Sequence, residues 1–140
     1  MKKRGKLIPE KAATSYILGY TCGNDLSSGD LFQADSQQTL RAHGFDTATS
    51  VGPFIETDVL PGRLNVALSI NGKVVIKGTT ADMIYSVEMI VSYITQFMTL
   101  NPGDIVFMGT PMTAPVFDGD VVGVHIESIG DLQNQVVAQQ

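Results

Sequence analysis

The feature that most constrains the fold is an alternating apolar run that leads directly into an Asn-Gly pair. Residues 64–70 read LNVALSI, which places an apolar side chain at every second position. This period of two predicts a half-buried strand. Asn71-Gly72 is the dipeptide most typical of a two-residue type I′ turn, so residues 73–77 are expected to pair back across it. The chain should therefore contain an antiparallel sheet.

A different period predicts one clear amphipathic helix, over about residues 86–99. Apolar side chains recur there with the i, i+3, i+4, i+7 spacing of a helix that buries one face. The Asn-Pro-Gly sequence at 101–103 ends it, because proline and glycine do not continue a helix. The apolar positions are Val87, Ile90, Val91, Ile94 and Phe97 or Met98.

The remaining segments predict short strands joined by turns. Residues 9–13 have the proline and acidic residue of a helix start, and residues 32–50 are polar and irregular, which favours an exposed loop. No alternating strand–helix rhythm, internal repeat or linker interrupts the chain, so we expect a single domain over residues 1–140 of the α+β class, with largely antiparallel sheets. The other expected strands are 16–22, 51–57, 105–108, 121–126 and 135–137.

Charge and composition exclude several classes of protein. The net charge is −5, and the one basic cluster, within residues 2–6, is typical of a solvated chain end. No basic stripe predicts a nucleic-acid partner. The most apolar segment, 83–100, is interrupted by polar residues and does not predict a membrane span. The single cysteine, Cys22, excludes an internal disulfide and favours a cytoplasmic location.

Asn24 and Asp25 follow a predicted buried strand and are candidate site residues. A carboxylate held at the end of a strand suits a hard cation such as Mg²⁺. Aspartate in this position is also common as a turn or cap residue. One carboxylate does not make a magnesium site, because this ion prefers nearly octahedral oxygen ligands.

Three other residues are candidate site residues, but each could equally have a purely structural role. Thr110, in a Gly-Thr-Pro turn after a predicted strand, offers a hydroxyl to a substrate carboxylate, although most such turns only reverse the chain. His43 and His125 are isolated histidines, each compatible with a surface or packing role or with that of a general base.

Read in order, seven short segments of this chain resemble the fumarylacetoacetate hydrolase family. Each segment alone is weak, but the ordered set from about residue 8 to residue 138 has the spacing of that family. The segments are GYTCGNDLSS (19–28), GFDT (44–47) with GP (52–53), NG (71–72), TADMI (80–84), MTLNPGDI (98–105), GTP (109–111) with GDVV (119–122), and IGDLQN (129–134).

The resemblance implies a mixed β-roll around a metal-centred pocket, with Mg²⁺ or Mn²⁺ as cofactor. The implied activity is hydrolysis, isomerisation or decarboxylation of small 2-oxo acids or dienedioates, as in 2-hydroxyhepta-2,4-diene-1,7-dioate isomerases and acylpyruvate hydrolases. Asp25 matches the metal-binding aspartate, and Thr47 matches a threonine near the metal. Thr110 and Asn24 would contact the substrate, and His43 is a possible base.

The chain also departs from the family pattern at positions that carry chemistry. The family takes two more metal ligands from a Glu-x-Glu pair upstream of the GYT segment, and no such pair occurs here. Gly29 stands where the family has an arginine, His43 where it has a lysine, and Phe32 where it has a glutamine. The glycine-rich stretch after GTP is replaced by MTAPV (112–116).

These departures leave two functional hypotheses open. The chain is either an enzyme that obtains further ligands from elsewhere, or a catalytically inactive, N-terminally truncated paralogue that acts as a scaffold or partner subunit. A wrongly assigned start, with the missing strand encoded upstream, would favour the enzyme. Because an absent strand leaves a sheet edge open, we expect a homo-oligomer, most simply a dimer.

Overall fold

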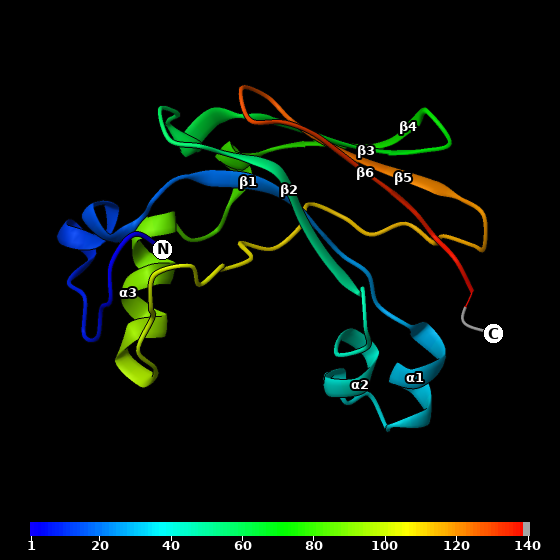
Figure 1. Cartoon of the computed structure of the whole chain (residues 1–140), viewed down its shortest axis with the longest axis horizontal. Helices are drawn as coiled ribbons and strands as arrows, with labels where there is room; N and C mark the ends of the chain where they lie inside the picture. The colour runs from blue at the N-terminus through cyan, green and yellow to red at the C-terminus, as the bar shows by residue number, and fades with distance from the viewer. Residues whose placement is uncertain (139–140) are drawn as a thin grey trace.

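The computed structural model describes residues 1–138 and contains two antiparallel sheets with helices at both ends (Figure 1). One sheet has the order β1-β2 and the other β4-β3-β5-β6. The α+β prediction with mostly antiparallel strands is confirmed. The strands are β1 (Tyr20–Asp25), β2 (Thr49–Glu56), β3 (Asn65–Ile70), β4 (Lys73–Thr79), β5 (Val121–Ile126) and β6 (Gly130–Gln135); the helices are α1 (Gly29–Ala34), α2 (Thr39–His43) and α3 (Val87–Phe97), with 3-10 turns η1 (Glu10–Tyr16), η2 (Pro61–Arg63) and η3 (Thr80–Asp82).

The β3–β4 hairpin forms as its sequence predicts. Asn71 and Gly72 have φ angles of 52° and 77°, the left-handed conformations that a type I′ turn requires at both central positions. Strand β3 pairs with β4 on one side and with β5 on the other. The hairpin therefore supplies one edge strand, β4, and one inner strand, β3, of the four-stranded sheet.

Two apolar clusters form the core, and Tyr20 packs against both. The first cluster lies between α3 and the N-terminal segment and is centred on Val91, which is 1% exposed. The second lies between the two sheets, where the Cys22 thiol of β1 contacts the carbonyl of Gly130 at 3.2 Å. Burial raises the pKa of this thiol above its ordinary value.

The helix predicted over residues 86–99 is α3, which begins after Ser86, and the Ser86 hydroxyl accepts a hydrogen bond from the amide of Met89. The hydroxyl of Thr95, the one buried polar residue of this helix, has both a hydrogen-bond donor and an acceptor as partners. The Thr95 hydroxyl accepts from the Ile8 amide (3.1 Å) and donates to the Val91 carbonyl (2.9 Å). None of the helices within residues 1–138 is long and apolar enough to cross a membrane.

The prediction of an exposed loop over residues 32–50 is wrong in part, because α1 extends to Ala34 and α2 covers Thr39–His43. Local polar contacts stabilise these helices. The Ser28 hydroxyl accepts from the Leu31 amide and caps α1, while the Arg41 guanidinium donates to the Asp35 carboxylate and ties α2 to the end of α1.

Three strand predictions also need correction. The first strand begins at Tyr20 rather than at residue 16, because η1 continues through Tyr16. The last strand begins directly at the Gly130 turn and ends at Gln135. Residues 105–108 are extended but form no ladder with another strand of the described chain, and glycines with positive φ, Gly103 and Gly109, bracket them.

Candidate active site

The candidate site is centred on Asp25, the last residue of β1. Asp25 is paired in register with Thr49, the first residue of β2. One oxygen of its carboxylate, Oδ1, accepts a hydrogen bond from the Thr49 hydroxyl at 3.2 Å, and the other, Oδ2, lies 3.2 Å from Nδ1 of His43. The side chains of Asp25 and His43 are each 40% exposed, so both remain accessible to a ligand.

His43 reaches this position because the connection between β1 and β2 folds back on itself. His43 is the last residue of α2, whose Ala42 is buried and accepts a hydrogen bond from the Ser28 amide. A second backbone bond, from the Leu26 amide to the Ala48 carbonyl, closes the base of the connection. The two residues proposed separately from the sequence, Asp25 and His43, are thus brought together.

The pleat of β1 directs alternate side chains to opposite faces of its sheet. Cys22 faces the four-stranded sheet, where its thiol contacts Gly130. Asn24 lies on this same face, and its register partner Ser50 donates to Oδ1 of Asn134 on β6 at 2.7 Å. Asn24 and Asp25 therefore project from opposite sides of the strand.

The face that carries Asp25 is crossed by the extended segment that follows α3. A Cβ at Gly23 would lie 2.6 Å from Cε1 of Phe107, so glycine is required for this close approach. The same segment continues to Thr110, whose hydroxyl donates to the Met112 carbonyl at 2.7 Å. No hydrogen bond in residues 1–138 joins Thr110 to Asp25 or His43.

Thr47 lies in the turn between α2 and β2, with a φ angle of 67°. It precedes Thr49 by two residues in the chain and makes no hydrogen bond to Asp25 within the described residues. Thr49 itself is the site residue that sequence reasoning missed. A β-branched residue such as Thr49 favours a strand. Its alignment with Asp25, however, depends on the length and fold of the entire segment between β1 and β2.

The donor atoms present do not fit a magnesium or manganese ion by themselves. Nowhere in residues 1–138 do three histidine, cysteine, aspartate or glutamate side chains gather as a metal site would require. Asp25 supplies one carboxylate, and both of its oxygens already have protein partners. Mg²⁺ usually needs more oxygen ligands in octahedral geometry.

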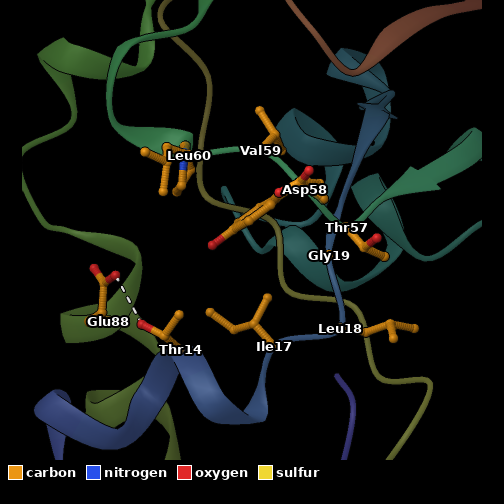
Figure 2. Close-up of a pocket in the computed structure, with 11 residues that line it drawn as sticks. Thr14, Ile17, Leu18, Gly19, Thr57, Asp58, Val59, Leu60 and Glu88 are labelled. Atoms are coloured by element: carbon orange, nitrogen blue, oxygen red, sulfur yellow. Dashed lines mark hydrogen bonds between the residues drawn. The ribbon is translucent and has the colours of Figure 1, made fainter.

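The opposite end of β1 borders a hollow of about 310 Å³ (Figure 2). Two carboxylates, Asp58 and Glu88, line it, and no basic side chain does so within the described chain. Glu88 accepts a hydrogen bond from the Thr14 hydroxyl at 3.4 Å. Burial first, and then the Glu88 charge, raise the pKa of Tyr20 there. Such a surface repels anions, so this hollow does not suit a 2-oxo acid.

Fold and site together define an α+β domain of stacked antiparallel sheets with a strand-end carboxylate held by a hydroxyl and an imidazole. Residues 1–137 match the family described as fumarylacetoacetate (FAA) hydrolase C-terminal. The chain therefore belongs to the fumarylacetoacetate hydrolase family, and it corresponds to the C-terminal domain of that family. Members of this family are generally metal-dependent.

Solved structures of this family are similar to the whole chain. A 5-carboxymethyl-2-hydroxymuconate delta-isomerase from Mycobacterium smegmatis superposes with a TM-score of 0.96 at 37% identity, covering 100% of this chain and 56% of the other. A 2-hydroxyhepta-2,4-diene-1,7-dioate isomerase from Mycobacterium marinum has a TM-score of 0.92 at 44% identity, covering 96% and 54%.

Curated relatives include a 4-hydroxyphenylacetate degradation bifunctional isomerase/decarboxylase from Salmonella dublin. It is 36% identical over 142 residues, which are 99% of this chain and 33% of the relative. A protein from Archaeoglobus fulgidus is 45% identical over 93% of this chain and 52% of its own length. The chain thus spans about half the length, or less, of these relatives.

Proposed function

We propose that this chain forms the Asp25 side of an active site that hydrolyses, isomerises or decarboxylates a small 2-oxo acid or dienedioate. The observation that supports this most directly is the paired placement of Asp25 and His43, with Oδ2 of the carboxylate 3.2 Å from Nδ1 of the imidazole. The names of the similar isomerases and of the bifunctional isomerase/decarboxylase support the substrate class.

In this proposal the Asp25 carboxylate orients the His43 ring through Nδ1. The other ring nitrogen, Nε2, is then available to accept a proton from a substrate carbon next to its oxo group. Thr49 fixes the second carboxylate oxygen and so holds Asp25 in place. Thr110 remains a proposed substrate contact, and Thr47 and Asp25 remain the proposed neighbours of the metal. Asn24 projects from the opposite face of β1 and is not proposed as a contact of the same substrate.

The proposed cofactor is Mg²⁺ or Mn²⁺. Because Asp25 is the one carboxylate at this site, the other ligands would have to come from water, from the bound oxo acid, or from a segment or chain other than residues 1–138. Such a metal, when bound, polarises the oxo acid group of the substrate. The cytoplasm is the proposed compartment, consistent with the single buried thiol.

A binding experiment tests this function without requiring turnover. Thermal unfolding is followed with and without Mg²⁺ plus oxalate, a mimic of the enolate form of a 2-oxo acid. A ligand at a hundredfold excess over its dissociation constant adds about 2.7 kcal/mol to the free energy of unfolding. We expect stabilisation of the natural chain that Asp25→Ala abolishes.

The molecule offers a matched control for that variant. His125 and Asp131 form a second exposed imidazole–carboxylate pair, with Nδ1 and Oδ1 2.9 Å apart, on β5 and β6. Asp131→Ala should leave the oxalate effect unchanged. Equal losses for Asp25→Ala and Asp131→Ala, or turnover of an acylpyruvate or oxaloacetate that survives Asp25→Ala, would contradict the proposed site.

A second candidate function is that of a catalytically inactive scaffold or partner subunit. It is favoured by the small number of metal ligands at the site, where Asp25 supplies one carboxylate. It is also favoured by Gly29, which leaves open space where the family has an arginine. Under this alternative the chain unfolds cooperatively at a temperature that Mg²⁺ and oxalate do not change. It would instead bind an intact family member, which co-purification of the two chains would detect.

A further inference from the structure

The Asn71-Gly72 turn that joins β3 to β4 has a chemical reactivity of its own. Asparagine is among the thermolabile residues, and its side-chain amide is most open to attack by the next backbone nitrogen when that residue is glycine, which has no side chain to hinder the approach. Both residues are exposed, so water reaches them. The reaction replaces the amide by an acid, and its consequence depends on what the amide contacts.

The side chain of Asn71 holds this turn against the residues that lead into β5. Its Nδ2 donates to Oδ1 of Asp120 at 2.8 Å, and its Oδ1 accepts from the Val121 amide at 2.9 Å. A backbone bond of 2.8 Å from the Asn71 amide to the Val121 carbonyl completes the contact. We call these three hydrogen bonds the Asn71 clasp.

Asp120 connects the clasp to the extended segment that crosses the Asp25 face, drawn in yellow to orange in Figure 1. Its second oxygen, Oδ2, accepts from the Phe117 amide at 2.8 Å, and its own amide donates to the Phe117 carbonyl at 3.1 Å. Phe117 lies at the C-terminal end of this segment, which carries Thr110 further upstream. One carboxylate therefore ties the β3–β4 turn to the end of the segment.

We propose that Asn71 is a site of spontaneous deamidation, and that the reaction opens the clasp irreversibly. The Gly72 nitrogen attacks Cγ of Asn71 and gives up its proton, and ammonia leaves, so that a succinimide ring forms. Water then opens the ring at either carbonyl and yields aspartate or its β-linked isomer, isoaspartate. In sum, one water is consumed and one ammonia is released, without an oxidant or a reductant.

The product cannot make the contacts of the clasp. A carboxylate at position 71 has no N–H to donate, and it would face the Asp120 carboxylate where Nδ2 and Oδ1 now lie 2.8 Å apart. Like charges at this distance repel. Isoaspartate also lengthens the backbone of a turn whose two central residues both have positive φ. Either product should release the turn from Asp120.

The clasp also protects Asn71 while the chain is folded. Cγ reaches the Gly72 nitrogen only when the carboxamide turns away from Asp120 and Val121, which breaks both side-chain hydrogen bonds. Deamidation should therefore be slow in the natural fold and faster in any state in which the clasp is open.

Mass spectrometry measures the reaction with an internal control. Trypsin, which cleaves after arginine and lysine, releases residues 64–73 as one peptide that contains both Asn71 and Asn65. Asn65 likewise donates from Nδ2 to a carboxylate, that of Glu127, at 2.8 Å, but it precedes Val66, whose branched side chain crowds the backbone nitrogen. After incubation of the folded chain at mildly alkaline pH, we expect the acid form at Asn71 and none at Asn65. Equal conversion of the two would overturn the assignment.

The rate distinguishes a clasped amide from one that is merely exposed. Deamidation in the folded chain should be at least about fivefold slower than in the isolated peptide 64–73, because two net hydrogen bonds shift the opening equilibrium by that factor or more. Asp120→Ala should raise the rate toward that of the peptide. Asp118→Ala is the matched control, since Asp118 accepts from the Ala138 amide in the same turn. Equal rates in chain and peptide, or in the two variants, would overturn the proposed protection.

Exchanging the two clasp side chains tests the consequence. Asn71→Asp reproduces the deamidated product, and it should lower the urea midpoint and speed hydrogen exchange of the Phe117 amide at least about fivefold. Adding Asp120→Asn should restore both, because the new amide at position 120 donates to the new carboxylate at position 71 and its oxygen still accepts from Phe117. Unchanged exchange in Asn71→Asp, or a double variant no more stable than that single variant, would overturn the proposal. Should Asn71→Asp alone not fold, the double variant is still expected to do so.

Discussion

The two ends of β1 are built from different interactions. At its first residue, Tyr20 packs against both apolar clusters. At its last residue, Asp25 leaves the core and is held by the Thr49 hydroxyl and the His43 imidazole. The helices next to Asp25 contribute a single buried residue, Ala42. One short strand thus connects a region stabilised by burial to a region organised by polar contacts.

This contrast suggests that the Tyr20 end of β1 determines the stability of the fold, whereas the Asp25 end carries the candidate active site. Apolar burial stabilises a protein in proportion to the area removed from water, whereas exposed hydrogen bonds contribute little net free energy. Substitutions around the Tyr20 end should therefore lower the free energy of unfolding. Substitutions around the Asp25 end should change ligand binding and leave the free energy of unfolding nearly unchanged.

The largest effect on stability is expected from Ile8→Ala. Ile8 is 2% exposed and belongs to the cluster around α3, and truncating a buried isoleucine costs about 2–5 kcal/mol. Leu40→Ala is the control from the other region, because Leu40 is 83% exposed and should change stability by less than about 0.5 kcal/mol. Urea unfolding measures both; similar losses would contradict the contrast.

The same substitution made in each region sharpens the comparison. Thr95→Val leaves the buried Ile8 amide without its hydrogen-bond acceptor, which costs about 1–3 kcal/mol. Thr49→Val removes an exposed hydroxyl bonded to Asp25 and should cost less than about 1 kcal/mol. Thermal unfolding measures the stability of both. Only Thr49→Val should also reduce oxalate binding, and an equal loss in Thr95→Val would show that the two regions are coupled.

The sequence predicted the parts of the fold that carry a strong local period. The β3–β4 hairpin and α3 were predictable because apolar alternation, the Asn71-Gly72 turn and the four-residue spacing act over a few neighbours. Helices α1 and α2 were missed since they are short and depend on contacts such as Arg41 with Asp35. Residues 105–108 have strand-like composition, but pairing depends on a neighbour that composition does not reveal.

The candidate site was predicted residue by residue but not as an arrangement. Asp25 and His43 are visible in the sequence, yet the contact between them requires α2 to fold back toward β1. Asn24 and Asp25 point to opposite faces of the sheet because successive residues of a strand alternate. This can be deduced only once both residues are known to lie within β1. Thr49 was missed because its importance comes from its register with Asp25.

An effect of comparable size, on ligand binding rather than stability, is expected from Gly29→Arg. A side chain at Gly29 meets open space, so stability should change by less than about 0.5 kcal/mol. An arginine offers two parallel donors to a carboxylate, and a hydrogen bond to a charged group contributes about 1.5–3 kcal/mol. Isothermal titration with Mg²⁺ and oxalate should show at least about tenfold tighter binding. Gly62→Arg, also in open space, is the control; no gain over it would favour the scaffold alternative.

The smallest effect concerns the ion pair that ties α2 to α1. A hydrogen bond from the Arg41 guanidinium, aided by its charge, lowers the pKa of the exposed Asp35 carboxyl. Because this pKa lies below its unfolded value, the pair stabilises the fold at neutral pH, and that contribution disappears as the pH falls through the folded pKa. Arg41→Gln should therefore lower the melting temperature slightly at neutral pH and leave it unchanged in acid.

The same variant should loosen α2, whose last residue is His43, and so reduce oxalate binding more than it reduces stability. Lys77→Gln, on the distant strand β4, is the matched loss of one exposed positive charge. If Arg41→Gln and Lys77→Gln bind oxalate equally well, the α1–α2 tether does not position His43. The polar end of β1 would then depend on the Asp25–Thr49 pairing alone.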